Sequence, residues 1–350
     1  MRRNAAALLM LALLVTAACG RSEEKQPAGG APGSPAALPE LRLGYFPNLT
    51  HAGALVGVAR GIFAKHLEGK ATLKTSTFNA GPSAVEALFS NAVDATYIGP
   101  NPAINAFQKS NGTAIRIIAG ATSGGAALVV KPGITKPADL KGKKIASPQL
   151  GNTQDVALRA WLKKQDLSTN VQGGGDVSVV PQENAQTLET FRAGQIDGAW
   201  VPEPWATRLV VDGGGTVLVD EASLWPGGRF LTTEMVVRTQ FLKAHRDVVE
   251  RLLAAHIEAT DFLNQHSDEA KTVVNAEIAK ITGKPLANAV IQRAWASLTF
   301  TYEPLAATLE KQAADAASAG LLEKVSLKGL FDIGPLNRVL RAADRKEVTV

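Results

Sequence analysis

One segment occurs twice in this chain, about a hundred residues apart, which is roughly the length of a small α/β lobe. The first copy reads EALFSNAVDATYIGPNPAI over residues 86–104, and the second reads ETFRAGQIDGAWVPEPWA over residues 189–206. Each copy runs through a helix end and an Asp into a short apolar stretch and then into Pro-x-Pro. We interpret this pattern as helix, turn, buried strand and rigid exposed loop. It predicts two similar lobes that hold something between them.

Residues 1–18 have the features of a lipoprotein signal peptide. Arg2 and Arg3 give a positive start, the apolar stretch after them is too short to span a bilayer, and small residues precede Cys19. This resembles the lipobox of bacterial lipoproteins, in which the cysteine is diacylated, although Thr16 stands where Leu or Val is commoner. We therefore expect a membrane anchor at Cys19. Residues 19–39 are rich in Pro and Gly and predict a disordered tether.

The composition argues against several classes of function. Cys19 is the only cysteine, so the chain has no internal disulfide. The formal net charge is +5, and the basic residues are scattered without interleaved aromatic residues, which argues against a nucleic-acid partner and suits the collection of small anions. No His pairs with another His at i,i+4, and neither a Gly-x-Ser-x-Gly motif nor a carboxylate, His and nucleophile set stands out. We expect no metal, no cofactor and no enzymatic activity.

Strand-like and helix-like segments alternate after residue 40, which predicts an α/β fold with parallel-rich sheets flanked by helices. The predicted strands are 41–46, 71–78, 95–98 and 115–119 in the first lobe, and 127–130, 143–146, 177–180, 196–201 and 216–219 in the second. The predicted helices between them are 52–64, 83–90, 103–110, 154–165 and 183–193. From Phe241 onward the pattern is helical.

The chain is expected to cross into the second lobe at residues 122–125 and to return near residues 229–233. Two crossings make a two-strand hinge. The predicted domains are therefore 40–122 plus 230–350 for lobe I and 123–229 for lobe II.

Ligands of open parallel α/β sheets bind at the carboxyl ends of strands, where helix N-termini offer unpaired N–H groups and the positive end of the helix dipole. Small and neutral polar residues occupy the loops at those positions in this chain. The candidate ligand-binding residues are Asn48, Thr50, His51, Gly81, Ser83, Gly99, Asn101, Thr122, Ser123, Gly151, Asn152 and Thr153. Donors without fixed charge suit a sulfonate, which is a monoanion whose three oxygens only accept hydrogen bonds.

Glu203 and Trp205, in the second Pro-x-Pro loop, complete the candidate set. Trp205 is expected to line the cleft. A carboxylate would repel an anion, so Glu203 either caps a helix, faces the hinge, or meets an amino group on the ligand.

Four further motifs carry a family resemblance. They are LGYFPNLTHA at residues 43–52, GPNP at 99–102, DLKGKKI at 139–145 and WVPEPWA at 200–206. In this order they resemble the periplasmic or lipid-anchored substrate-binding proteins of ABC importers for nitrate, aliphatic sulfonates and taurine, and the likeness runs from about residue 41 to 310. The resemblance implies a two-lobe periplasmic-binding-protein-like fold of type II, delivery of a solute to transmembrane permease subunits, and no catalysis. It points to Asn48, Thr50, Ser83, Asn101, Ser123, Asn152 and Thr153 as ligand contacts.

The function that follows is capture of a small anionic solute, foremost an aliphatic sulfonate, by a monomer located outside the cytoplasm and anchored to the bacterial membrane or held in the periplasm. Nitrate and bicarbonate are alternative solutes. The Asn48-x-x-His51 motif also resembles binders of a thiamine pyrimidine precursor, which would need stacking from Tyr45, Phe46, Trp200 or Trp205.

Overall fold

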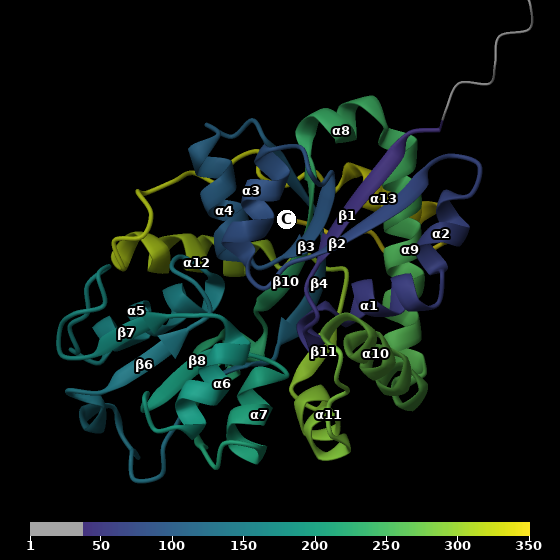
Figure 1. The fold of residues 1–350 in the computed structure, drawn as a ribbon. Helices are drawn as coiled ribbons and strands as arrows, with labels where there is room; N and C mark the ends of the chain where they lie inside the picture. The colour runs from purple at the N-terminus through teal and green to yellow at the C-terminus, as the bar shows by residue number, and fades with distance from the viewer. Residues whose placement is uncertain (1–37) are drawn as a thin grey trace, which may run out of the picture. The chain divides into compact units, whose positions relative to one another are not determined.

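The computed structural model describes residues 38–350, which form two mixed β-sheets with helices on their faces (Figure 1). The predicted leader, Cys19 and the tether up to residue 37 lie outside the described residues. This arrangement confirms the predicted α/β fold class.

Sheet A has six strands in the order β2-β1-β3-β10-β4-β11. Its strands are β1 (Glu40–Tyr45), β2 (Thr72–Thr77), β3 (Ala95–Ile98), β4 (Ile115–Gly124), β10 (Leu231–Arg238) and β11 (Leu298–Phe300). Strands β1, β2 and β3 pair in parallel, and β10 pairs antiparallel with both β3 and β4.

Sheet B has five strands in the order β7-β6-β8-β5-β9. Its strands are β5 (Ala126–Val130), β6 (Lys144–Ser147), β7 (Ser178–Pro181), β8 (Gly198–Pro202) and β9 (Thr216–Asp220). Strand β6 pairs in parallel with β7 and β8, while β5 pairs antiparallel with β8 and β9.

The two sheets repeat one plan, which explains the repeated sequence. In each sheet a parallel trio is followed by an antiparallel strand, so β1, β2 and β3 correspond to β6, β7 and β8. The repeated Asp has the same role in both copies, because Asp94 accepts the N–H of Arg42 at 3.0 Å and Asp197 accepts the N–H of Lys144 at 2.8 Å. Each Asp thus ties the start of one parallel strand to the segment that leads into its neighbour.

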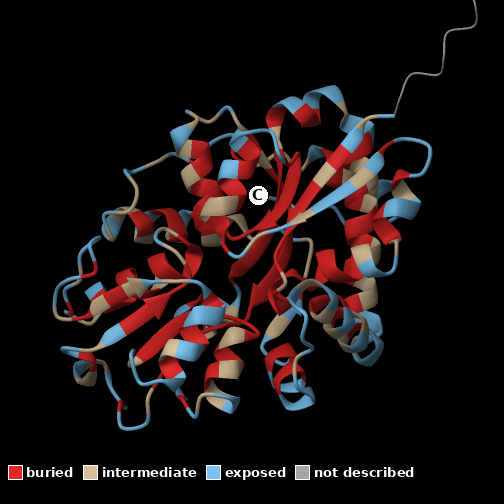
Figure 2. Ribbon diagram, viewed as in Figure 1, coloured by how far each residue is buried: buried red, intermediate tan, exposed pale blue. Residues whose placement is uncertain are grey.

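Helices cover both faces of each sheet, and the central strands are buried along most of their length (Figure 2). One core of sheet A packs under α1 (Ala52–Ala59), α2 (Ile62–Leu67), α9 (Arg246–Gln265), α10 (Ser267–Thr282), α11 (Asn288–Trp295) and α13 (Gly334–Ala342), with α8 (Thr239–Ala244) at its edge. The other core lies under α3 (Gly81–Phe89), α4 (Pro100–Lys109) and α12 (Ala306–Ser318). Sheet B packs against α5 (Thr153–Lys164) on one face and against α6 (Asn184–Arg192) and α7 (Trp205–Val211) on the other.

The chain passes between the sheets twice. Strand β4 ends at Gly124 and β5 begins at Ala126, with positive φ angles of 80° at Gly124 and 72° at Gly125, which glycine adopts without the steric cost of a Cβ. The return runs from β9 through two short 3₁₀ helices, Glu221–Leu224 and Pro226–Gly228, into β10.

Three predictions about local structure were wrong. Neither Pro-x-Pro is an exposed loop: Pro100–Pro102 forms the buried first turn of α4, where proline costs no hydrogen bond, and Pro202–Pro204, which joins β8 to α7, is buried as well. The helix predicted over 52–64 ends at Ala59, since Gly61 has a φ of 68° and a new helix starts at Ile62. The helical pattern after Phe241 is interrupted by β11, a strand too short to show an alternating pattern.

Candidate ligand-binding site

The carboxyl ends of the parallel strands of both sheets point to a common cavity, which we call the inner cavity. Its volume is about 20 Å³, which is room for about one water molecule. It is lined by Phe46, Asn48, Thr50, His51, Asn79, Ala80, Gly99, Asn152, Thr153, Gln154, Asn184, Pro202 and Thr232. Residues from both sheets therefore enclose it.

Several helices begin at the inner cavity, and none of these helices has its N-terminus capped by a side chain of its N-cap residue. They are α3, α4, α5, α6 and the 3₁₀ helix Leu49–His51. Each such terminus leaves backbone N–H groups without intrahelical partners and carries the positive end of a helix dipole. Their convergence gives the cavity a positive potential without a cationic side chain.

His51 adds a neutral donor. The Phe46 N–H donates to Nδ1 of His51 at 3.3 Å, so the neutral ring carries its proton on Nε2 and can donate from there. Complete burial lowers the pKa of His51 to about 3, and its ring stacks on Phe46 with 4.2 Å between centroids. The imidazole therefore stays uncharged at neutral pH.

Three side-chain amides around the cavity, those of Asn48, Asn152 and Gln154, have their oxygens engaged by other protein groups. The Trp205 indole donates to Oδ1 of Asn48 at 2.9 Å, and the Gly81 N–H donates to Oδ1 of Asn152 at 3.3 Å. Oε1 of Gln154 accepts from Nδ2 of Asn152 at 3.0 Å. Since the acceptors are occupied, the Asn48 and Gln154 amides can offer N–H donors to a ligand.

Two buried polar atoms at the cavity have no hydrogen-bond partner within the described residues, namely Oγ1 of Thr153 and Oδ1 of Asn184. A buried polar group without a partner costs free energy, so such groups mark positions where a ligand or water completes the hydrogen bonding. The lining contains no Asp, Glu, Lys or Arg. The lining is therefore neutral: the Thr153 hydroxyl can donate to an anion, whereas Oδ1 of Asn184 only accepts and so fits a donor on a ligand or a water molecule.

Gly99 brings the two halves of the site together. A Cβ at this position would lie 2.3 Å from Oγ1 of Thr153, so only glycine permits this approach of α4 to α5. Asn152 joins the halves a second time through its bond to Gly81.

Six of the candidate residues line the inner cavity, namely Asn48, Thr50, His51, Gly99, Asn152 and Thr153. Other candidates lie behind them and hold the backbone. The Thr122 hydroxyl donates to the carbonyl of Thr50 at 2.7 Å, and Oγ of Ser123 accepts from the N–H of Phe230 at 3.2 Å. Gly151 donates to Asp155 at 2.9 Å, and Ser83 is half-buried on α3 outside the lining.

Asn101 does not face the inner cavity. It lies in the first turn of α4, where its Nδ2 donates to the carbonyl of Gln312 in α12 at 3.0 Å. The helical turn that replaced the predicted loop directs this side chain toward α12.

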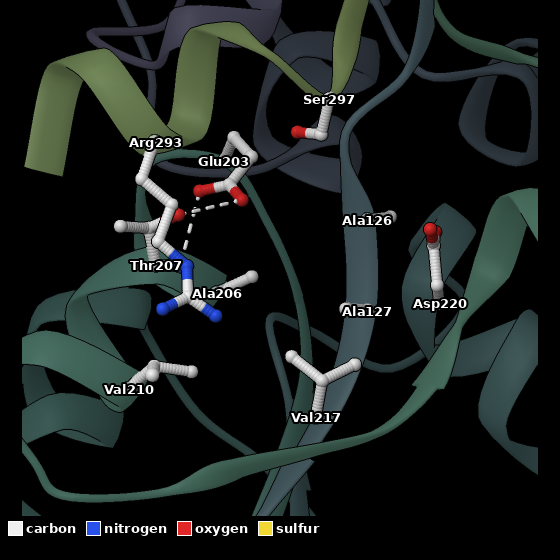
Figure 3. Close-up of a pocket in the computed structure, with 10 residues that line it drawn as sticks. All are labelled: Ala126, Ala127, Glu203, Ala206, Thr207, Val210, Val217, Asp220, Arg293 and Ser297. Carbon is white, nitrogen blue, oxygen red and sulfur yellow. Dashed lines mark hydrogen bonds between the residues drawn. The ribbon is translucent and has the colours of Figure 1, made fainter.

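Glu203 lies in a different cavity of about 150 Å³, between sheet B and α11 (Figure 3). Its carboxylate accepts from the N–H of Thr207 at 3.1 Å and from the Thr207 hydroxyl at 2.9 Å, and Arg293 and Ser297 of the α11 side face the same space. Burial raises the pKa of Glu203 to about 7 despite these two hydrogen bonds. Two of the three expected roles fit this geometry: the carboxylate caps helix α7, and Glu203 lies against the crossing between the sheets, where its N–H donates to the carbonyl of Gly125 at 2.8 Å.

Trp205 lines a larger cavity of about 550 Å³, which we call the outer cavity. It is lined by Pro47, Asn79, Ala185, Arg192, Pro204, Trp205, Arg208, Asp212, Ile278, Thr282, Lys284, Pro285, Leu286, Ala287 and Val290. The Arg208 guanidinium lies over the Trp205 ring, 4.7 Å from its centroid, and the indole N–H reaches Asn48 of the inner cavity.

Sequence reasoning missed several residues of the inner cavity, namely Phe46, Asn79, Ala80, Gln154, Asn184, Pro202 and Thr232. A signal existed for Asn79, which directly follows the predicted strand 71–78, and for Asn184, which lies in the first turn of the predicted helix 183–193. Thr232 had none, since it lies at the start of the antiparallel β10, to which the rule about carboxyl ends does not apply.

Within residues 38–350, no cluster of three or more His, Cys, Asp or Glu side chains could hold a metal ion. No helix of this part of the chain has the length and hydropathy needed to span a membrane.

Comparison with known proteins places this site in context. Residues 34–280 match the model of the NMT1-like family. The taurine-binding periplasmic protein of Escherichia coli (strain K12) is 32% identical over 206 residues, which cover 59% of this chain and 61% of that protein. The match thus spans less than two thirds of that relative's length.

Solved structures share the fold. The alkanesulfonate-binding protein of Xanthomonas axonopodis pv. citri, bound to MOPS, superposes with a TM-score of 0.68 at 23% identity, covering 83% of this chain and 96% of that one. The periplasmic nitrate-binding protein of Synechocystis PCC 6803 gives a TM-score of 0.75 at 16% identity, covering 87% and 89%. The described chain therefore has the fold of periplasmic binding proteins.

Proposed function

Since this chain belongs to the NMT1-like family, we propose that it is the extracytoplasmic solute-binding component of an ABC importer, which captures a small oxyanion and delivers it to the transmembrane subunits. The foremost candidate is an aliphatic sulfonate. The activity is binding and release without catalysis. The name of the E. coli relative, a taurine-binding protein, supports this class of solute.

One observation carries the proposal: a cavity lined by neutral polar groups lies where helix N-termini of both sheets converge. A sulfonate remains a monoanion at physiological pH and only accepts hydrogen bonds, so every oxygen can be matched by an amide, hydroxyl or imidazole N–H. If three to five such bonds contribute roughly 1.5–3 kcal/mol each, a binding free energy near −8 kcal/mol, or a micromolar Kd, remains after the cost of ordering.

We further propose that the two sheets form the separate lobes predicted from the sequence, 40–122 plus 230–350 and 123–229, and that they move about the two crossings. The inner cavity, at about 20 Å³, is too small for a whole sulfonate, so the ligand enters when the lobes separate. Contacts to both lobes then favour the shut form.

Cys19 is proposed to anchor the mature protein to the membrane. Globomycin-sensitive processing and a diacylglycerol adduct on Cys19, measured by mass spectrometry of the membrane fraction, support this anchor. Full release of the wild-type chain in soluble form, like that of Cys19→Ser, contradicts it.

Isothermal calorimetry and thermal unfolding of the mature chain test the solute class. The ligands are ethanesulfonate, hexanesulfonate, taurine, nitrate and bicarbonate. At a hundred times its Kd, a ligand stabilises the fold by about 2.7 kcal/mol. Absence of heat and of any Tm shift with all of them at millimolar concentration rejects the proposal.

Hydroxymethylpyrimidine serves as the contrasting ligand. Of the four aromatic residues that this alternative needs, only Phe46 lines the inner cavity, and its ring already stacks on His51. Trp200 is fully buried with its indole bonded to Glu221. Stabilisation by the pyrimidine and not by any sulfonate overturns the sulfonate assignment.

A further inference from the structure

We propose that the outer cavity takes the organic body of the ligand, and that its basic side chains bind a second anionic group at the ligand's far end. The inference rests on the function proposed above, because it assumes that a sulfonate head occupies the inner cavity. It narrows the substrate class to organic sulfonates that carry a second anion.

The two cavities are adjacent and share part of their lining. Asn79 lines both cavities. Pro47 lines the outer cavity and its neighbour Asn48 the inner one, and in the same way Ala185 lines the outer cavity and Asn184 the inner one. The hydrogen bond from Trp205 to Asn48 connects the two linings. A ligand whose head lies among the inner donors can therefore extend its body past the Trp205 indole.

The size and lining of the outer cavity fit an organic body. Its 550 Å³ greatly exceeds the space that nitrate or taurine would need. Ile278, Leu286, Val290 and the Trp205 ring of α7 give it apolar lining. Each methylene that becomes fully buried there lowers the Kd by up to about fourfold, on the usual transfer free energy of a CH₂ group.

The charged residues of the outer cavity have an excess of cations. Arg192, Arg208 and Lys284 line it with a single acid, Asp212, which pairs with Arg208 at 3.2 Å. Arg192 has only a 3.7 Å contact with Glu189, and no carboxylate of the described chain pairs with the Lys284 ammonium. Two cations therefore remain available to a ligand.

These two cations approach from different halves of the protein. Arg192 belongs to α6 on sheet B, and Lys284 lies between α10 and α11 on the side of sheet A. When the halves approach, like charges repel unless an anion lies between them. A carboxylate, sulfonate or phosphate on the ligand would pair with both cations and bridge the halves.

The test compares two ligands that share a sulfonate head and a benzene ring. These are 4-sulfobenzoate, which has a second anion, and 4-methylbenzenesulfonate, which does not. Calorimetry of the mature chain should give 4-sulfobenzoate a Kd about tenfold lower, since one charge-assisted hydrogen bond is worth about that factor. This preference should shrink as salt is raised.

The double variant Arg192→Gln/Lys284→Gln should abolish the preference, so that the two ligands measured in this variant have the same Kd within about twofold. Lys243→Gln, an exposed lysine on α8, is the matched control and should keep the preference. The inference is overturned if the wild type binds the two ligands equally, or if the preference for 4-sulfobenzoate survives in the double variant. In either case, tight binding of a sulfonate still upholds the proposed function. Failure of every sulfonate to bind rejects both.

Discussion

At the scale of single residues, burial decides which protonation state each titratable group holds. His51 is kept neutral by a pKa lowered to about 3, so its contribution to stability is present above pH 6.5 and is lost as the pH falls toward 3. A charged imidazole there would attract an anion more strongly but would lack solvation. The site therefore relies on dipoles, whose strength does not change with pH.

Two asparagines with similar burial make a matched pair for testing the site. Asn152→Ala should weaken sulfonate binding by about 1–3 kcal/mol, because it removes the bond to Gly81 that joins the two halves and frees the Gln154 amide. Asn101→Ala should leave the Kd unchanged and lower the Tm, because its partner is the backbone of α12. Calorimetry and thermal unfolding of both variants check this. Equal losses of affinity would place Asn101 in the site after all.

Glu203 makes stability depend on pH. Its pKa is raised by burial from 4.5 to about 7, so the stability present below about pH 4.5 is lost as the pH rises to 7, by about 3 kcal/mol if the shift is fully expressed. Glu203→Gln, which keeps the shape and cannot ionise, should flatten this part of the stability profile. Urea unfolding of both proteins at pH 4.5 and pH 7 measures it.

Burial also raises the pKa values of Glu221 and Glu234, so the free energy of unfolding of Glu203→Gln should still fall somewhat as the pH rises. Identical slopes in the wild type and Glu203→Gln would mean that Glu203 is solvated.

At the scale of elements, the approach of α4 to α5 depends on one missing Cβ. Gly99→Ala should hold the two helix N-termini apart and weaken ligand binding at least about tenfold, since a methyl group there meets Thr153 Oγ1 at 2.3 Å. Gly53→Ala in α1 is the control, because its Cβ would have no neighbour closer than 3.8 Å. Titration calorimetry distinguishes them, and unchanged affinity in Gly99→Ala would show that the helices need not approach so closely.

The strands and helices were predictable where the pattern of apolar residues and the residues that flank it indicate a single kind of element. Strand β3 has its predicted bounds, because four apolar or small residues lie between an Asp and a Gly-Pro. The first Pro-x-Pro was misread because proline fits both a loop and the first turn of a helix, and only packing against α12 decides. For the site, the rule that ligands bind at the carboxyl ends of strands located the inner cavity. It could not show that Asn101 faces α12, because the direction of a helical side chain depends on where the helix begins, and sequence spacing alone does not give that position.

At the scale of the whole described chain, α12 is a contact between the two sheets beyond the two crossings. Lys163 and Lys164 of α5 bond to the carbonyl of Ser318 at 2.9 Å and to Asp315 at 3.1 Å, while Asn101 and Leu231 of the sheet A side bond to Gln312. In the proposed motion, the two lobes would move against a helix that contacts both.

Ligand binding should therefore make the chain more compact. Small-angle scattering of the mature chain should give a smaller radius of gyration with a saturating sulfonate than without it, because contacts to both sheets favour the shut form. A non-binding solute at the same concentration is the control. An unchanged radius of gyration on saturation contradicts the proposed motion.

The strand order has one more consequence, for the course of folding. Every strand of sheet B comes from one continuous stretch of the chain, whereas β10, which separates β3 from β4 in sheet A, is encoded more than a hundred residues after them. During synthesis or refolding, the first half of sheet A must wait with an unpaired edge until that late strand arrives, since contacts distant in sequence form slowly. A chaperone that shields β3 at this stage would cover an unpaired strand edge, which is a template for aggregation.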